Sequence, residues 1–453
     1  MVATSVQSWI NPSADTSVDS SLSASVGHSV CSSVSSSVKN AQLFYSQVRQ
    51  QSLGLIESLS SEDCALQASA FVSPAKWHLA HTTWFFETFI LIPHVDGYEP
   101  FNNHFQVLFN SYYNGVGEQF LRPKRHLLSR PSLPDVKLYR EHVDQAMKHC
   151  LTPEFLNQQP KIAELITLGL HHEMQHQELL LMDLKYSFFQ NPLFPVYSNN
   201  HLPISSPVSP LSFNSMQGGI QHIGHQGDGF HFDNEQPRHK EFVADFKIAN
   251  RQICNGEYLE FIMDGGYDNA LLWLSDGWAW LKQERQENPN FQNNTPAPLY
   301  WIKQQDQWFE FTLHGLQPLD INAPVSHINF YEAHAYSQWA QKRLPTESEW
   351  EVLANQSTEA INNDDFSKVF HGVNTQQLFN QNWIWTSSAY QPYTGFKAAE
   401  GAVGEYNGKF MCNQMVLRGG CVLTPNGHLR STYRNFFYPQ DRWPMTGLRL
   451  ADN

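Results

Sequence analysis

One stretch, residues 160–187, constrains the fold more than any other part of the sequence. Its apolar side chains recur every three or four residues, the spacing of one face of an α-helix, and no proline follows the first position. One stripe along this face holds Ile162, Leu165, Gly169, His172, His176, Leu179 and Asp183. Such a helix must bury its apolar stripe against other helices. The sequence therefore predicts a helical bundle in which two histidines, one turn apart, face the core.

Two further segments have the same helical spacing. The stretch "SPAKWHLAHTTWFFETFIL" begins with Ser73, a typical N-cap residue, and Pro74, which suits the first helical position. Trp77, His81 and Phe85 then share an inward stripe, and His78 is offset from it by one turn. "PDVKLYREHVDQAMKHCL" completes the set of long helices.

Histidines inside an apolar core indicate a metal site. Burying several imidazoles costs free energy unless each ring has a partner, and one metal ion could serve three of them. His171 is a poor candidate because it projects about 100° away from His172 on the helix. Spacing alone leaves His78 and His81 both open as the third ligand.

The sequence from His172 to His176 is H-E-x-x-H, the pattern of zinc proteases, with Glu173 as the possible general base. The extended protease motif would require Gly at 179 and His at 182, where this chain has Leu179 and Met182. A site of three neutral histidines also suits iron(II), which would keep its charge and open coordination positions for a thiolate, an imidazole and dioxygen. Zinc hydrolysis remains the alternative.

The sequence changes character along the chain. Residues 1–40 contain 14 Ser and lack the basic start and apolar run of a signal peptide, so they are predicted to be disordered. The bundle is assigned to residues 41–193, and the segment 194–212, rich in Pro, Ser and Asn, is expected to be a linker. Residues 213–453 have short apolar runs and two capping boxes, Asn329 with Glu332 and Thr346 with Glu349, which predict an irregular α+β domain.

Composition restricts the partners. The formal charge of −14 argues against a general nucleic-acid binder. No stretch approaches the length that spans a bilayer, and the six cysteines form no C-x-x-C pair, which favours reduced thiols in the cytoplasm. The composition therefore indicates neither a nucleic-acid partner nor a membrane.

Several motifs, taken in order, resemble the sulfoxide synthases of ergothioneine biosynthesis. They are "SPAKWHLAH", "FNSYYNGVGEQFLRPKRHLLSRP", "HHEMQHQEL", "PVSHINFYEAHAYSQWAQKRLPTESEWE", "WTSSAYQPYTGF", "FMCNQMVLRGG" and "RNFFYPQDRWPMTGLRLA". The resemblance covers nearly everything after residue 41. It implies a DinB-like helical bundle followed by an α+β domain like the formylglycine-generating enzyme, with a C-type-lectin-like fold. The implied reaction uses non-haem Fe(2+) and O2 to join cysteine or γ-glutamylcysteine to hercynine as a sulfoxide.

The resemblance also implies roles for individual residues. It places the iron ligands at His81, His172 and His176, and so selects His81 over His78. The substrate-binding positions that it implies are Gln175, Arg122, Arg125, Asn435, Phe436, Phe437 and Trp443, with Tyr112 and Tyr113 as catalytic tyrosines. Arginines suit a thiol substrate's carboxylate, and aromatic faces suit a trimethylammonium group.

The chain departs from the family pattern at Ile384, Cys421 and His126, and Asn114 and Gly115 beside the tyrosines leave the choice of thiol open. The second domain lacks the reactive cysteine pair of a true formylglycine-generating enzyme and is expected to be a scaffold. A selenoneine synthase and an ovothiol-type histidine sulfoxide synthase are alternatives on the same scaffold, although the ovothiol enzymes usually carry a C-terminal methyltransferase domain. A non-catalytic binding module is a further alternative, which would leave the buried histidines unexplained.

Overall fold

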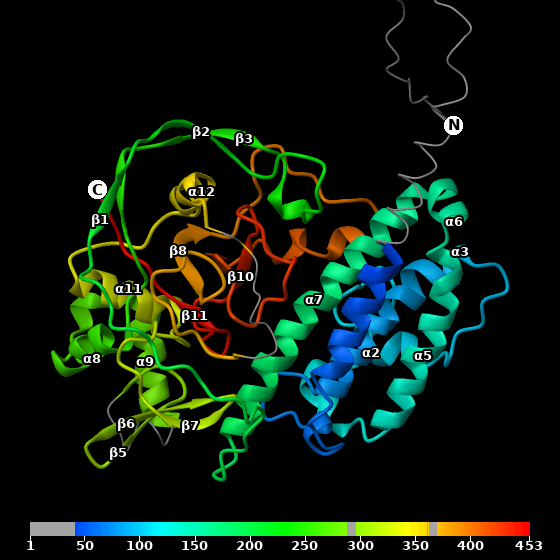
Figure 1. The fold of residues 1–453 in the computed structure, drawn as a ribbon, viewed down its shortest axis with the longest axis horizontal. Helices are drawn as coiled ribbons and strands as arrows, with labels where there is room; N and C mark the ends of the chain where they lie inside the picture. The colour runs from blue at the N-terminus through cyan, green and yellow to red at the C-terminus, as the bar shows by residue number, and fades with distance from the viewer. Residues whose placement is uncertain (1–40, 288–295, 360, 362–368) are drawn as a thin grey trace, which may run out of the picture.

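The computed structural model describes residues 41–287, 296–359, 361 and 369–453. The predicted disorder of residues 1–40 lies outside this range. A helical bundle comes first along the chain and a mixed α/β domain follows it (Figure 1). Among the residues described, none of the helices combines the length and the apolarity needed to span a membrane.

The bundle consists of a helix over residues 41–54 and the long helices α2, α5 and α7, with α2 packed against both α5 and α7. A π-helical turn, η2, follows α2 and leads into α3, so the helical path continues through Pro93. The bounds are η1 Asp63–Ala65, α2 Ala75–Phe86, η2 Glu87–Leu91, α3 Ile92–His94, α4 Phe105–Leu108, η3 Arg122–Leu127, α5 Leu133–Cys150, α6 Pro153–Gln158 and α7 Pro160–Phe189.

Helix α2 begins one residue later than the sequence predicts. Pro74, with extended backbone angles, occupies the N-cap, and Ser73 lies outside the helix. The Ser73 backbone N–H donates to Asp183 Oδ2 on α7, and its hydroxyl accepts a hydrogen bond from Arg125. Ser73 is therefore used to connect three segments of the bundle instead of capping α2.

A close approach of α2 and α7 occurs at Gly169. A Cβ atom there would lie only 2.8 Å from the Phe86 ring and 2.9 Å from the Phe85 ring. Because glycine has no side chain, these two rings pack directly onto the α7 backbone, one turn before His172. This contact sets the spacing of the two helices that carry the histidines.

The second domain holds several small sheets and short helices. In the part of the chain that the structure describes, the strand orders are β1-β4-β12, β10-β9-β8-β11, β2-β3 and β5-β6-β7, and only the β11-β8 pair is parallel. The strands are β1 Phe213–Met216, β2 Gly219–Ile223, β3 His239–Val243, β4 Phe246–Ala249, β5 Trp301–Gln304, β6 Gln307–Thr312, β7 Gly315–Pro318, β8 Trp383–Ala389, β9 Met415–Arg418, β10 Asn435–Phe437, β11 Thr446–Gly447 and β12 Ala451–Asp452.

The helices of this domain include α8 Asn255–Met263, α9 Ser275–Glu287, α11 Phe330–Trp339 and α12 Glu347–Gln356, with the 3-10 turns η4 Asp233–Glu235, η5 Ala270–Leu272, η6 Ala402–Glu405 and η7 Gly408–Phe410. Both predicted capping boxes are confirmed. The Asn329 side chain accepts from the Glu332 N–H at the start of α11, and the Thr346 side chain accepts from the Glu349 N–H at the start of α12. The predicted α+β character of this region is confirmed as well.

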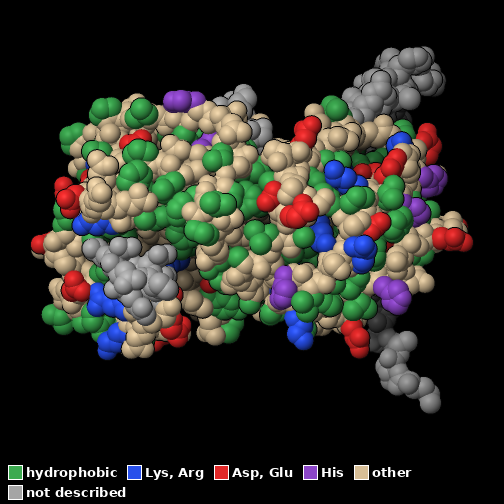
Figure 2. Space-filling model, turned by 90° about the horizontal axis from the view of Figure 1, so that it is seen from below, with side chains coloured by type: hydrophobic (Ala, Val, Ile, Leu, Met, Phe, Trp, Pro, Cys, Tyr) green, Lys and Arg blue, Asp and Glu red, His purple; other side chains and the backbone are tan. Residues whose placement is uncertain are grey.

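Helix α7 lies along the boundary between the bundle and the second domain (Figure 1). One face carries the histidines toward α2, and another contacts the second domain, where Glu178 accepts hydrogen bonds from the Trp383 indole (2.7 Å) and the Thr424 hydroxyl (2.6 Å). The two domains consequently share one apolar core. On the face shown in Figure 2, acidic and basic side chains are interspersed without forming a broad basic surface, consistent with the acidic net charge.

Candidate metal centre

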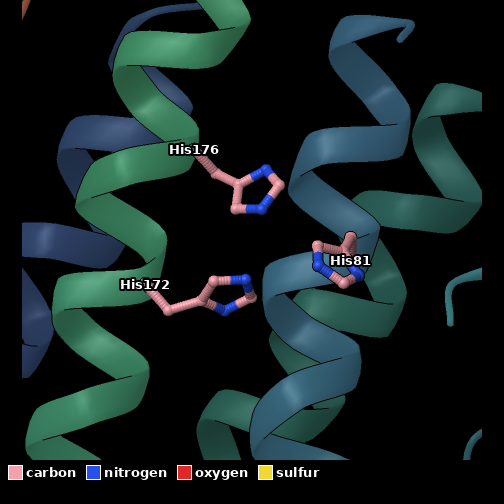
Figure 3. Close-up of side chains that lie close together, drawn as sticks. All are labelled: His81, His172 and His176. Atoms are coloured by element: carbon pink, nitrogen blue, oxygen red, sulfur yellow. The ribbon is translucent and has the colours of Figure 1, made fainter. Parts of the chain in front are cut away.

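Three histidines from two helices meet inside the bundle. His81 on α2 points toward His172 and His176 on α7 (Figure 3), and one ligand nitrogen from each lies within 4.8 Å of the other two. Adjacent turns of α7 supply two of the ligands, and α2 supplies the third across the close contact at Gly169. The three residues predicted to be metal ligands are thus brought together in space.

The ring nitrogens of this triad are available for a metal. Over the described ranges, Nε2 of His81 and both ring nitrogens of His172 are buried without a hydrogen-bond partner, an arrangement that costs free energy unless a ligand binds there. Burial lowers the pKa of His172 to about 3 and holds the pKa values of His81 and His176 well below the usual range. All three rings are therefore neutral near pH 7, the form that binds metals.

The ring of His81 is fixed in one orientation. Its Nδ1 donates to the Phe109 carbonyl oxygen at 2.6 Å, so the proton is on Nδ1 and the Nε2 lone pair faces the triad. The ring also stacks on Trp77 at 4.6 Å and on Trp84 at 5.6 Å between centroids. Such contacts are typical of a metal ligand whose ring orientation is preorganised in the metal-free protein.

Glu173, the acidic residue of the H-E-x-x-H pattern, is directed to other partners. It is buried and accepts hydrogen bonds from Arg49 (2.8 Å), Arg140 (2.8 Å) and Ser52 (2.6 Å). Burial by itself would raise its pKa, but the two guanidinium groups outweigh burial and lower the pKa to about 2. A carboxylate held in this way by two arginines is a poor general base, because it has little tendency to take up a proton near neutral pH.

Gln175 lies beside the triad and is held from both sides by tyrosines of the second domain. Its Nε2 donates to the Tyr433 hydroxyl at 2.6 Å, and its Oε1 accepts from the Tyr406 hydroxyl. The Tyr406 ring lies 5.6 Å from the His172 ring. Neither tyrosine was among the residues predicted from the sequence, because both are far from α7 in the chain and only the fold brings them to the metal centre.

The two predicted catalytic tyrosines stack on each other at 4.6 Å. Tyr113 is buried and lies 5.6 Å from Trp84, which in turn stacks on His81. Tyr112 is half-buried, and its ring lies 6.4 Å from the Tyr406 ring. Tyr112 is thus placed at the edge of the site, next to a tyrosine that contacts a ligand ring.

Arg125 is a buried cation beside the triad. Its guanidinium carbon lies 3.3 Å from the centroid of the Trp77 ring, whose own ring stacks on His81, and its NH1 donates to Ser73 Oγ at 2.8 Å. Burial lowers the pKa of Arg125 well below its usual range. Its Nε is buried without a hydrogen-bond partner within the described residues, so a bound anion would offset a substantial desolvation cost. Arg122 is exposed and donates to the Phe71 carbonyl.

The remaining predicted binding residues lie on or near β10. Asn435, Phe436 and Phe437 form this strand and are half-buried. Phe436 stacks on Tyr390 at 4.0 Å, and Phe437 contacts Trp443 at 5.4 Å. Trp443 itself is committed to a polar contact, because its indole N–H donates to Asp183 Oδ1 at 3.2 Å.

His171 faces away from the triad, as the helical geometry predicts. Its Nδ1 lies 3.0 Å from Nδ1 of His428, and its ring stacks on Phe230 at 3.7 Å. His428 in turn lies 3.1 Å from the Tyr433 hydroxyl. This histidine therefore belongs to the contacts between α7 and the second domain.

Comparison with known proteins agrees with this arrangement. Residues 45–180 match the DinB superfamily, and residues 206–453 match the sulfatase-modifying factor enzyme 1-like domain. The chain is 30% identical over 318 residues to a hercynine oxygenase of Mycolicibacterium smegmatis, a match covering 63% of this chain and 70% of that protein. The chain belongs to the hercynine oxygenase family.

Two further relatives match over very different shares of their own length. The hercynine oxygenase of Mycobacterium tuberculosis is 26% identical over 436 residues, covering 90% of this chain and 97% of that protein. The ergothioneine biosynthesis protein 1 of Schizosaccharomyces pombe is 24% identical over 271 residues, covering 56% of this chain and 32% of that protein. The matches of residues 45–180 and 206–453 to the two domain families confirm the prediction of a DinB-like bundle joined to a formylglycine-generating-enzyme-like domain.

Proposed function

We propose that this protein is an iron(II)-dependent oxygenase that joins the sulfur of a small thiol to the ring carbon between the two nitrogens of hercynine. One oxygen atom of O2 ends on sulfur as the sulfoxide. The other leaves as water with the hydrogens of the thiol S–H and the ring C–H, so the four-electron oxidation balances. Cysteine and γ-glutamylcysteine are the proposed thiols, and ergothioneine biosynthesis is the proposed context.

The observation that carries this proposal is the neutral triad His81, His172 and His176 in a chain of the hercynine oxygenase family. These three residues would hold the iron, which supplies the binding and activation of dioxygen. The unpartnered, buried nitrogens of His81 and His172 and the lowered pKa values of all three rings fit a divalent metal ion. A set of three neutral imidazoles adds no negative charge, which leaves the ion able to attract an anionic thiolate.

The chain's other residues would bind and orient the two substrates. Arg125, which is buried and whose Nε has no hydrogen-bond partner in the described chain, suits the carboxylate of the thiol substrate. Gln175, held by Tyr406 and Tyr433, presents a fixed amide beside the triad for polar contact with hercynine. Phe436 and Phe437 offer aromatic faces for the trimethylammonium group.

Tyr112 is the proposed proton donor at the reacting centre. A phenol is a suitable donor because it is neutral near pH 7 and its hydroxyl can both give and accept a hydrogen bond. Tyr112 is half-buried and lies next to Tyr406, a position from which its side chain would contact a bound substrate. Tyr113, stacked beneath it and fully buried, would support the orientation of Tyr112.

Zinc-dependent hydrolysis is the less favoured function. It requires a carboxylate that can take a proton from a metal-bound water, and Glu173 is instead paired with Arg49 and Arg140. A selenium donor, or histidine in place of hercynine, would use the same triad, so these alternatives are separated by substrate tests.

The deciding experiment is oxygen uptake by protein loaded anaerobically with iron(II), given hercynine with cysteine or with γ-glutamylcysteine, followed by mass spectrometry. The expected product is the hercynyl-thiol sulfoxide, formed with one O2 consumed per product. The His172→Ala protein should retain its fold and lose both iron and turnover. Full iron loading without oxygen uptake would contradict the proposal, and preferential turnover of histidine or of a selenium donor would replace the substrate assignment.

A further inference from the structure

His78 lies outside the triad but touches one of its members. It is on α2, three residues before His81, and is buried. Its Nδ1 is 2.8 Å from Nδ1 of His176, and its Nε2 is 3.1 Å from Oδ2 of Asp183. Asp183 is also buried, one turn beyond Leu179 on α7. Three side chains thus form a line that runs from the metal centre to a carboxylate.

The direction of the hydrogen bonds in this line is determined by the carboxylate. An ionised Asp183 can only accept, so the proton of His78 is on Nε2. A neutral His78 then has a lone pair on Nδ1 and can only accept there. His176 must therefore donate from its Nδ1, which leaves the lone pair on its Nε2. The line imposes on His176 the tautomer that binds a metal through Nε2.

Asp183 is held by both domains. Its Oδ2 accepts from the Ser73 backbone N–H at 2.8 Å, and its Oδ1 accepts from the Trp443 indole at 3.2 Å. Within the part of the chain described here, His78 is the only side chain of the bundle that hydrogen-bonds to Asp183. The carboxylate therefore has a fixed position and a histidine as its polar side-chain partner in the bundle.

We propose that His78 and Asp183 are positioning residues that fix the tautomer and ring orientation of His176, and that Trp443 makes this control depend on the second domain. The inference rests on the proposed metal centre and goes beyond it, since it assigns a role to His78 and Asp183, which are neither metal ligands nor predicted substrate-binding residues. Partners that fix a ligand histidine in this way typically change metal affinity 10- to 100-fold when they are removed.

The ligands His81 and His176 are held in place by different kinds of hydrogen-bond partner. A backbone carbonyl holds His81, whereas a chain of side chains holds His176. Substitution can therefore remove the anchor of His176 without changing the ligand itself. The metal alone is a sufficient probe, so the test is independent of catalysis.

The test uses zinc(II), which is diamagnetic, bound to protein labelled with 15N in its histidines. Nitrogen chemical shifts report which ring nitrogen of His176 carries the proton, and competition with a chelator gives the zinc dissociation constant. The expected result for wild type is a protonated Nδ1. His78→Phe should raise the dissociation constant by about 10- to 100-fold and mix the two tautomers. His78→Asn should restore much of the affinity, because its amide oxygen lies near the place of Nδ1 and can accept from His176.

Two further variants address the outer partners. Trp443→Phe keeps an aromatic ring but removes the N–H to Asp183, and it should produce a smaller change of the same sign. His371→Phe is the matched control, because His371 is a buried histidine of the second domain whose Nε2 lies 3.5 Å from Glu310 Oε2. It should leave both the zinc affinity and the His176 shifts at their wild-type values. Thermal unfolding of each metal-free variant reports any general loss of stability.

The outcomes separate the inference from the proposed function. Wild-type protein that fails to bind metal would overturn the metal centre itself. Metal binding by wild type, with unchanged affinity and unchanged His176 shifts in His78→Phe and Trp443→Phe, would overturn only the positioning role. Should His78→Phe not fold, the comparison of His78→Asn and Trp443→Phe with wild type decides.

Discussion

At the scale of single residues, two neighbours on α7 are placed in opposite environments. His172 faces α2 with both ring nitrogens unpartnered within the described chain, whereas Glu173 is enclosed by Arg49 and Arg140. The same five-residue pattern would be catalytic in a zinc protease. Here its acidic residue stabilises the bundle, because it neutralises two buried cations that come from different helical segments.

Glu173→Gln should therefore act mainly on stability. Removing one member of a buried ion-pair network leaves uncompensated charge, and we expect a loss of roughly 3 kcal/mol or more in the free energy of unfolding, measured by urea denaturation. Asp144→Asn is the matched control. Asp144 pairs with Arg49 at 2.7 Å but is partly exposed, so its loss should cost about 1 kcal/mol or less. Equal, small effects of both substitutions would contradict this role of Glu173.

A second prediction at this scale concerns pH. Burial raises the pKa of Asp441 to about 7, although Arg122 lowers it somewhat. The native state therefore favours protonated Asp441, and its contribution to stability is complete below pH about 4 and lost as the pH rises through about 7. Asp441→Asn does not titrate, so its stability relative to wild type should increase by about 1 kcal/mol between pH 5 and pH 8. A constant difference across this range, by urea denaturation, would show that Asp441 is ionised throughout.

At the scale of helices and strands, periodicity predicted much of the site. The spacing of His172 and His176 on α7 and the offset of His171 both follow from helical geometry. Spacing could not decide between His78 and His81, because both lie on α2 and both prove to be buried beside α7. The difference between them depends on the rotation of α2 against α7, which is a property of the packed pair and not of either sequence segment.

Gly169 provides a test of that packing. Gly169→Ala should force the Phe85 and Phe86 rings away from α7, because its Cβ would lie under 3.0 Å from both. We expect a loss of about 1–3 kcal/mol in the free energy of unfolding, together with weaker metal binding as α2 shifts. In Gly54→Ala the new Cβ meets nothing within 4 Å, and this helical control should be neutral or stabilising by up to about 1 kcal/mol. Thermal unfolding measures the loss of stability, and zinc titration measures the change in metal affinity. Unchanged metal affinity in Gly169→Ala would mean that the spacing of α2 and α7 does not govern the metal site.

At the scale of the whole molecule, the contacts that complete the site connect distant parts of the chain. Tyr406 and Tyr433 reach Gln175 from more than 200 residues away, and Trp443 reaches Asp183 from 260 residues away. Short-range patterns carry no information on such pairings, so the sequence motifs could predict which segments matter but not which atoms meet. Trp443 is an example, since the contact of its indole N–H with a carboxylate of the bundle could not be foreseen from its motif.

The same interface predicts how the protein unfolds. Glu178 on α7 accepts from Trp383 and Thr424 of the second domain, and apolar residues of both domains form one continuous core. Bundle and second domain should therefore unfold in a single calorimetric transition, because neither can separate without exposing that core. Glu178→Ala would remove the acceptor of the buried Trp383 indole N–H, at a cost of about 1–3 kcal/mol, whereas Glu178→Gln keeps an acceptor oxygen and should cost less. Two resolved transitions in the wild-type protein, or equal effects of the two substitutions, would contradict this coupling. If the protein unfolds in one transition, and its unfolding temperature is much lower in Glu178→Ala than in Glu178→Gln, then α7 is the element that couples the stability of the metal centre to that of the second domain.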